Sequence, residues 1–303
     1  MITVAHVSDV HALDLTGVRA RDFLSHKRLG GAANLLLRRR NKHPVSTFEA
    51  LIDDLNELRP DHVALTGDLT NLSLAPEFAR ARGLLDRIAL GPAGVTVVPG
   101  NHDVYTWAAA RAGLFEKVLG DYALSDGAEA VEFPVVRRRG ALCLIGLSSA
   151  RPSPVPFADG RIGAAQLERV EAALRRSQGC FRLVLVHHPP VDNRHVLLRG
   201  LRDRRQLQEV LRRAGAELVI HGHEHRDVRG SVEGPAGPIP VMGVGSATYA
   251  DPRAERRARY NLLHIEGTGF TVEQRVFDPA TGRFAAAPPP PTGSEVTVGG
   301  GTY

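Results

Sequence analysis

The sequence has few cysteines and no long apolar run. Its 303 residues include only two cysteines, Cys143 and Cys180. Both lie beside apolar stretches and outside any Cys-x-x-Cys pair, so we expect buried free thiols in a reducing compartment. Nowhere do about 18 consecutive apolar residues occur, which argues against a membrane-spanning helix but leaves attachment to a membrane surface open. The first ten residues lack the basic start and cleavage site of a signal peptide, and we expect a strand there.

Aromatic side chains make up only 5% of the residues, and the net charge of +5 is unevenly distributed. Between Arg19 and His43, eight Lys and Arg residues face Asp22 alone, which gives +7 for the segment and about −2 for the remainder. With so few aromatic side chains among the cations, we do not expect nucleic acid as a partner. The basicity belongs to one segment and calls for a local explanation.

That segment has two interpretations. Leucines such as Leu35, Leu36 and Leu37 lie among its cations, so residues 19–43 could bind an anionic membrane surface or a lipid head group. Alternatively, residues 32–40 form a helix that packs its leucines on the sheet while its arginines stay solvated.

Short apolar or β-branched runs alternate with amphipathic runs of helical period, which predicts an α/β protein with a central sheet. A hairpin is expected near the end, between residues 261–265 and 270–277. Seven runs are expected as strands buried on both faces: 2–8, 62–66, 95–99, 141–148, 182–186, 217–220 and 240–244.

Helix start and stop signals lie between these runs. Ser46 and Glu49 have the spacing of a capping box, and Pro60 should stop the helix that follows them. Pro76 suits the first turn of a second helix, and Asp203 could cap a third.

No internal repeat or linker divides the first 280 residues. We expect one domain over residues 1–282, with a basic amphipathic insertion at 14–43 that is longer than an ordinary strand-to-helix connection. Residues 283–303 are rich in alanine, proline and glycine and are expected to form a disordered tail.

Five short clusters of polar residues each fall where an expected strand ends. Because loops at the carboxyl ends of strands converge on one crevice in an open α/β sheet, we expect one site. The clusters are Asp9-Val10-His11, Gly67-Asp68, Gly100-Asn101-His102-Asp103, His187-His188-Pro189 and Gly222-His223-Glu224-His225.

Carboxylate, amide and imidazole groups without thiolates suit Zn, Mn or Fe. Asp9 and His11 lie two apart on what we expect to be an extended segment, so both side chains should point to the same side, and His223 and His225 repeat this spacing. These pairs with Asp68 and Asn101 supply too many ligands for one four-coordinate ion, which favours two divalent ions bridged by one carboxylate. Of the adjacent His187 and His188, we expect only one to be a ligand.

Competing motifs do not fit. The run from Gly222 to His225 lacks the second histidine of a helical zinc-protease motif, because position 227 is Asp. The chain also has no phosphate-binding Gly-x-x-x-x-Gly-Lys loop and no serine nucleophile elbow.

In order and spacing, the five clusters resemble the calcineurin-like metallophosphoesterase superfamily over roughly residues 1–280. The resemblance implies an αββα sandwich of two mixed β-sheets flanked by helices. It also implies that His102 stabilises the phosphate or protonates the leaving oxygen, with Asp103 as its orienting partner. By the same resemblance, the ligands of one metal are Asp9, His11 and His225, those of the other are Asn101, His187 and His223, and Asp68 bridges the two.

The activity implied is hydrolysis of a phosphodiester or diphosphate bond by metal-activated hydroxide. The alternatives are a UDP-diacylglucosamine pyrophosphatase of the lipid A pathway at the membrane surface, a cyclic nucleotide phosphodiesterase, and a non-enzymatic scaffold of the same fold. A scaffold should have lost ligands or His102, and this sequence keeps them all. We expect a cytoplasmic protein. If its substrate is a lipid, it should also attach peripherally to the inner membrane surface.

Overall fold

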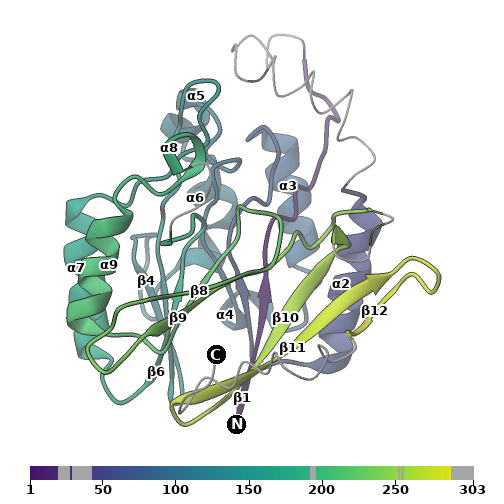
Figure 1. Cartoon of the computed structure of the whole chain (residues 1–303). Helices are drawn as coiled ribbons and strands as arrows, with labels where there is room; N and C mark the ends of the chain where they lie inside the picture. The colour runs from purple at the N-terminus through teal and green to yellow at the C-terminus, as the bar shows by residue number, and fades with distance from the viewer. Residues whose placement is uncertain (20–27, 29–42, 192–195, 252, 254–255, 288–303) are drawn as a thin grey trace.

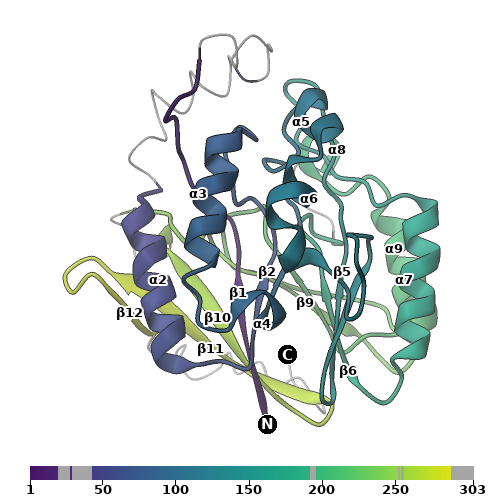
Figure 2. The same ribbon diagram turned by 180° about the vertical axis from the view of Figure 1, so that it is seen from behind.

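The computed structural model is a sandwich of two six-stranded mixed sheets between two helical layers. Figures 1 and 2 show α2 (Val45–Leu58) and α3 (Ala75–Leu85) outside one sheet and α7 (Ala164–Arg176) and α9 (Arg204–Ala214) outside the other. This is the αββα arrangement that the family resemblance implied, so the predicted fold class is confirmed. The structure describes residues 1–19, 28, 43–191, 196–251, 253 and 256–287.

The first sheet joins the two ends of the described chain. The central strand β1 pairs in parallel with β2 and antiparallel with β10, and β2 pairs in parallel with β3. In spatial order the strands are β12 (Arg283–Ala286), β11 (Gly269–Asp278), β10 (Arg259–Glu266), β1 (Ile2–Val7), β2 (His62–Leu65) and β3 (Val95–Val97).

The second sheet is built entirely between β3 and β10. Its strands β5, β6, β7 and β9 are parallel, so their carboxyl ends meet at one edge. In spatial order the strands are β4 (Val135–Arg139), β5 (Leu142–Gly146), β6 (Phe181–Leu185), β7 (Leu218–His221), β9 (Ile239–Gly243) and β8 (Val228–Val232).

Apolar side chains fill three layers of this sandwich. Val4, Leu144 and Ile220 belong to the cluster between the two sheets. Ala5, one residue from Val4, belongs instead to the cluster under α2 and α3, as the alternation of side chains along a strand requires. Both faces of β1 are thus buried, which explains its continuous apolar sequence.

The remaining helices are short. None of the helices in the described ranges is long and apolar enough to cross a membrane. They are α4 (Gly91–Gly94), α5 (Trp107–Ala112), α6 (Leu114–Leu119), the 3-10 helix η3 (Gly120–Ala123) and α8 (Val196–Arg199).

All seven expected strands and the expected hairpin are present, and Cys143 and Cys180 are buried free thiols as predicted. Two capping predictions were wrong. Helix α2 begins at Val45 after Pro44, so Ser46 lies inside it and caps nothing. Asp203 precedes α9, but its carboxylate accepts hydrogen bonds from the backbone N–H groups of Ile162 and Gly163 instead.

The expected domain end at residue 282 is corrected. Residues 283–286 form β12, which pairs with β11, because Phe284 finds a buried position against the first sheet. The rest of the predicted tail, from residue 288, and most of the basic insertion at 14–43 lie outside the described residues.

Candidate metal centre

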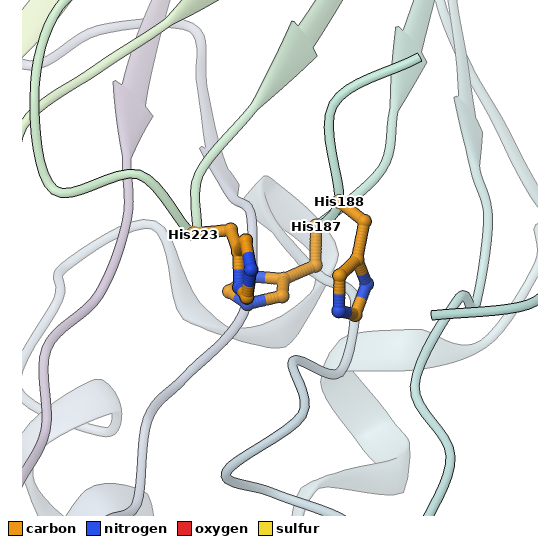
Figure 3. Close-up of side chains that lie close together, drawn as sticks. All are labelled: His187, His188 and His223. Carbon is orange, nitrogen blue, oxygen red and sulfur yellow. The ribbon is translucent and has the colours of Figure 1, made fainter. Parts of the chain in front are cut away.

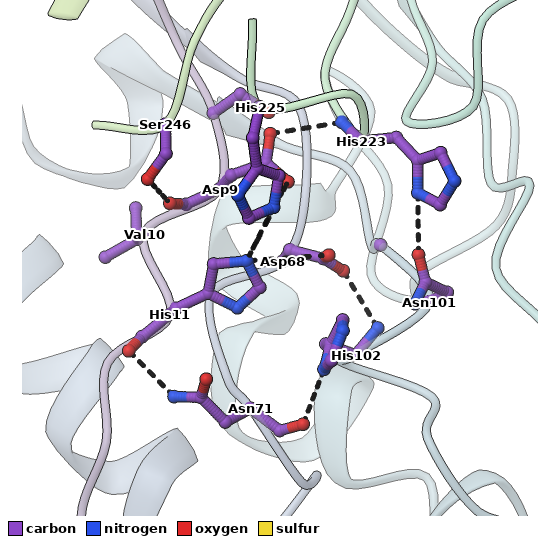
Figure 4. A network of polar contacts seen from close by, with 12 residues as sticks. Asp9, Val10, His11, Asp68, Asn71, Asn101, His102, His223, His225 and Ser246 are labelled. Carbon is purple, nitrogen blue, oxygen red and sulfur yellow. Dashed lines mark hydrogen bonds and ion pairs between the residues drawn. The ribbon is translucent and has the colours of Figure 1, made fainter. Parts of the chain in front are cut away.

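The predicted ligands come from the loops that follow parallel strands of both sheets (Figure 4). Five of these seven side chains are buried, whereas His223 and His225 are partly exposed, His225 with 25% of its side chain accessible. The first sheet supplies Asp9, His11, Asp68 and Asn101, and the second supplies His187, His223 and His225.

One group of donor atoms is formed by Asp9, His11, Asp68 and His225. The Nε2 atom of His225 lies 3.0 Å from His11 Nε2 and 3.2 Å from Asp9 Oδ1. His11 Nε2 lies 3.9 Å from Asp68 Oδ2. Asp9 Oδ1 is buried and accepts no hydrogen bond within the described chain, which suits an atom reserved for a cation.

A second group lies on the other side of Asp68. His187 Nε2 is 3.1 Å from Asn101 Oδ1 and 3.4 Å from Asp68 Oδ2. His223 Nδ1 is 2.9 Å from Asn101 Oδ1 and 3.2 Å from His187 Nε2. Nitrogen and oxygen donors at such separations, without thiolates, fit Mn, Fe or Zn. Asp68 Oδ2 faces both groups, as a bridging carboxylate would.

His188 is adjacent to His187 but points differently (Figure 3). Its Nδ1 lies 2.8 Å from Ser149 Oγ, and its Nε2 lies 3.2 Å from the carbonyl oxygen of Ala158. Both ring nitrogens therefore have partners within the protein, although the ring is close to His223. A nitrogen of His188 nevertheless lies close enough to those of His187 and His223 for the three to hold a metal ion. That only one of the two adjacent histidines is a ligand therefore stays a prediction.

The backbone around the donors is unusual. Asp9, His11, Asp68, His223 and His225 all have positive φ, between 50° and 71°. The expectation of an extended Asp9-Val10-His11 segment is therefore wrong, since β1 ends at Val7 and the two side chains converge through left-handed turns. Such conformations cost free energy in non-glycine residues and cluster at functional sites.

Two motif glycines allow the loops to approach each other. A Cβ atom on Gly100 would collide with the carboxylate and backbone nitrogen of Asp68. A Cβ atom on Gly222 would collide with the Ser8 hydroxyl and would lie 2.7 Å from Asp9 Oδ2. The glycines in these motifs therefore make room for the carboxylates.

Without metal, the charges of the donor groups are set by one another and by burial. Burial would lower the pKa of His187, but the carboxylates of Asp68 and Asp9 raise it to about 9. Burial would raise the pKa of Asp68, yet the field of His187 outweighs it and holds that pKa well below its usual value. Burial and neighbouring histidines hold the pKa values of His11 and His223 well below the usual range. These imidazoles are thus neutral, as metal ligands must be.

His102 lies at the edge of the donor groups, and its Nδ1 donates to the carbonyl oxygen of Asn71 at 2.6 Å. Asp103, expected as its orienting partner, serves another purpose. The Asp103 carboxylate accepts from the backbone of Thr70 and of Gly100, each at 2.9 Å. That prediction is corrected: a carbonyl holds the His102 ring, and Asp103 joins two loops. Burial, reinforced by the charge of Asp68, raises the pKa of Asp103 to about 6.

A cavity of about 450 Å³ opens above the donor groups, and part of its lining was not predicted. His43 is buried there, with its Nδ1 2.8 Å from Thr248 Oγ1 and its ring centroid 4.8 Å from that of His11. Its place after the basic segment gives no signal of this role, because the contact joins distant parts of the chain. Cavity-lining residues absent from the sequence prediction are His43, Ala158, Arg199, Glu224, Arg226, Tyr249 and Arg256.

Two bacterial proteins are similar in sequence. One is a probable cyclic nucleotide phosphodiesterase of Rhodococcus erythropolis, 29% identical over 196 residues, which are 63% of this chain and 58% of that protein. The other is a cAMP/cGMP dual specificity phosphodiesterase of Mycobacterium tuberculosis, 29% identical over 204 residues, 65% of this chain and 58% of that protein. The chain thus spans less than two thirds of the length of these relatives.

Solved structures share the fold at lower identity. A dimetal phosphatase from Danio rerio has a TM-score of 0.58 and 16% identity, with 94% of this chain and 98% of that chain covered. A purple acid phosphatase from yellow lupin has a TM-score of 0.61 and 14% identity, with 94% and 52% covered. The profile of the calcineurin-like phosphoesterases matches residues 2–227, three quarters of the sequence. The chain therefore belongs to the calcineurin-like phosphoesterase family.

Proposed function

We propose that this protein is a metal-dependent phosphodiesterase with a dinuclear centre. The observation that carries the proposal is the pair of donor groups that share Asp68 Oδ2, one completed by Asp9, His11 and His225. Asn101, His187 and His223 complete the other. Two divalent ions held there would activate water near neutral pH and neutralise charge on a bound phosphate.

The protein's own groups then position the substrate and handle the proton of the leaving group. The carbonyl oxygen of Asn71 can only accept, so His102 carries a hydrogen on Nδ1. A second proton on Nε2 makes this ring a cation that can bind a phosphate oxygen and protonate the departing oxygen. The backbone N–H of His102 donates to Asp68 Oδ1 at 2.8 Å, which fixes His102 relative to the shared carboxylate.

The relatives, whose names describe cyclic nucleotide phosphodiesterases, support a phosphodiester as the substrate class. We therefore infer a phosphodiester or diphosphate substrate and a poorer reaction with phosphomonoesters. The domain that performs the reaction is proposed to span residues 1–287. An acylated diphosphate at a membrane surface is the competing hypothesis, and it depends on residues 19–43, which lie almost wholly outside the described ranges.

The test is hydrolysis of bis(4-nitrophenyl) phosphate, 3′,5′-cyclic AMP and 4-nitrophenyl phosphate by protein reconstituted with Mn, Fe or Zn. We expect activity that a chelator removes, with higher kcat/KM for the diesters. Asp68→Ala should abolish turnover and reduce bound metal, because both ions lose a shared ligand. Asp53→Ala is the matched control, since Asp53 is exposed and 3.9 Å from Arg87. Two tightly bound ions and normal turnover in Asp68→Ala would refute the dinuclear centre.

A further inference from the structure

We propose that Arg199, Arg226 and Arg256 form a cationic rim that selects substrates with a second anionic group beyond the scissile phosphate. This inference rests on the proposed function, because it concerns the same cavity. The substrate class it names is a diphosphate diester or a phosphodiester that carries a further phosphate.

The three arginines come from separate parts of the fold. Arg199 ends α8, Arg226 follows the last predicted ligand, and Arg256 precedes β10. All three side chains are exposed and line the cavity that also contains Asp68 and His102. Three guanidinium groups from three segments around one opening form a site that no single sequence motif encodes.

Carboxylates of the cavity do not neutralise these arginines. Among the described lining residues the carboxylates are Asp68, at the base, and Glu224. Within the described part of the chain, the three arginines make one ion pair, between Arg226 Nη2 and Glu224 Oε2 at 3.5 Å. Arg199 and Arg256 have no ion pair or hydrogen bond from their side chains within the described ranges. Asp251 also lies in the field of Arg256, but its carboxylate is ion-paired with Arg253. Among the described lining residues of the rim, one carboxylate thus faces three guanidinium groups, a net charge of about +2.

The centre below the rim does not need this additional charge. Asp9 and Asp68 bring two negative charges, so two divalent ions, one hydroxide and one phosphodiester monoanion are together neutral, and a protonated His102 would add one positive charge. A 3′,5′-cyclic nucleotide, with a single phosphate charge, leaves the rim uncompensated. A second phosphate placed at the cavity mouth would compensate it, and guanidinium groups suit phosphate oxygens because they donate in a planar fork.

Each rim arginine is replaced by glutamine, singly and together, in metal-reconstituted protein. The matched control replaces three exposed arginines that lie outside the cavity lining, Arg161, Arg176 and Arg205. These substitutions remove the same amount of charge. We expect the triple rim variant to lower kcat/KM for UDP-glucose, a diphosphate diester, by about 10-fold or more. Its kcat/KM for bis(4-nitrophenyl) phosphate and cyclic AMP should change less than about 3-fold. The difference should shrink as salt rises from about 50 to 300 mM.

A binding measurement separates this inference from the proposed function. Calorimetry compares AMP with ADP, which differ by one phosphate, in the parent protein and both triple variants. We expect the parent to bind ADP more tightly, and the rim variant alone to lose that preference. Equal losses of affinity for AMP and ADP in the rim variant, or a parent that prefers AMP, would overturn the inference. Absence of metal-dependent hydrolysis together with rim-dependent ADP binding would instead overturn the proposed function and leave the rim assignment standing.

Discussion

His102 and Asp103 are adjacent in the sequence, yet their side chains serve different loops. His102 reaches Asn71, whereas Asp103 connects Thr70 and Gly100. We predict that His102→Ala lowers turnover by about 10² to 10⁴, with a smaller loss for substrates whose leaving groups need no proton. Asp103→Asn should destabilise the protein by about 1 to 3 kcal/mol, because a buried donor loses its acceptor.

Leaving-group dependence distinguishes the two roles. Hydrolysis rates are measured for a series of aryl diesters with progressively poorer leaving groups. The rates of His102→Ala should fall further below those of the parent as the leaving group becomes poorer, whereas the rates of Asp103→Asn should stay in constant proportion to those of the parent. Urea unfolding gives the stability of each variant. Parallel series in both variants would mean that His102 positions the phosphate and transfers no proton.

The raised pKa of His187 makes metal binding release a proton. In the metal-free protein that pKa is about 9, so the imidazole is protonated at pH 7.5, whereas a metal requires its neutral form. We predict that His187 releases about one proton as the ions bind, in addition to any proton lost by metal-bound water, so that affinity rises at least about tenfold per pH unit below about pH 9. Calorimetry in buffers of different ionisation enthalpy measures this release. No dependence on the buffer at pH 7.5 would contradict the prediction.

That the predicted ligands lie together could be predicted from sequence, because each motif directly follows a buried strand and parallel strands bring such ends together. The orientation of the side chains could not, since Asp9 and His11 leave the extended conformation that their spacing suggested. Arg199 and Arg256 were also missed. Nothing in their neighbouring residues distinguishes them from solvated arginines, and only the fold places them at one opening.

Among the elements, β4 shows why a strand can be missed. Its sequence contains Arg137, Arg138 and Arg139 in succession, which does not resemble a buried strand. Arg137 is nevertheless 3% exposed, and its guanidinium donates to carbonyl oxygens that include those of Val95 and Leu124, both at 2.6 Å. Backbone carbonyls from neighbouring loops thus satisfy a buried charge, a partnership that depends on tertiary contacts.

The strand β12 depends on one aromatic side chain. Phe284 is 4% exposed, and its ring centroid lies 5.4 Å from that of Phe277 and 5.6 Å from that of Tyr260. We predict that Phe284→Ala lowers the free energy of unfolding by about 3 kcal/mol, the usual cost of such a cavity. Turnover of the folded protein should be unchanged because β12 is the edge strand farthest from the loops of the site.

Chemical denaturation measures this loss of stability. Leu58→Ala is the control, since 41% of Leu58 is exposed and its truncation should cost well under 1 kcal/mol. A loss in Phe284→Ala no larger than in this control would show that β12 contributes little to the sheet.

At the scale of the whole molecule, buried neutral histidines should limit stability in acid. Burial lowers the pKa of His62 to about 3, and His62 Nε2 lies 2.8 Å from Thr96 Oγ1. The unfolded chain binds this proton at about pH 6.5, so the stabilising term is complete above that pH and is lost as pH falls toward 3. The loss is at most about 1.4 kcal/mol per pH unit.

Urea unfolding at pH 7 and pH 5 tests the contribution of His62 to the pH dependence of stability. The parent should lose about 2 kcal/mol more across the interval than His62→Gln, which has no titrating ring. His264→Gln, the same substitution at a partly exposed histidine, is the control. If the free energy of unfolding depends on pH identically in the parent and His62→Gln, His62 does not contribute to the loss of stability in acid.

The division of the predicted ligands between the two sheets has a mechanical consequence. Asp9 and His11 of the first sheet meet His225 of the second, while Asn101 of the first meets His187 and His223 of the second. Each proposed ion would therefore act as a further cross-link between halves of the sandwich that are already joined by apolar packing and by hydrogen bonds such as that between His187 Nδ1 and the carbonyl oxygen of Thr66. Metal binding would connect the two sheets at the end where the substrate enters. The opening would then become more rigid in the same step that makes the centre able to hydrolyse its substrate.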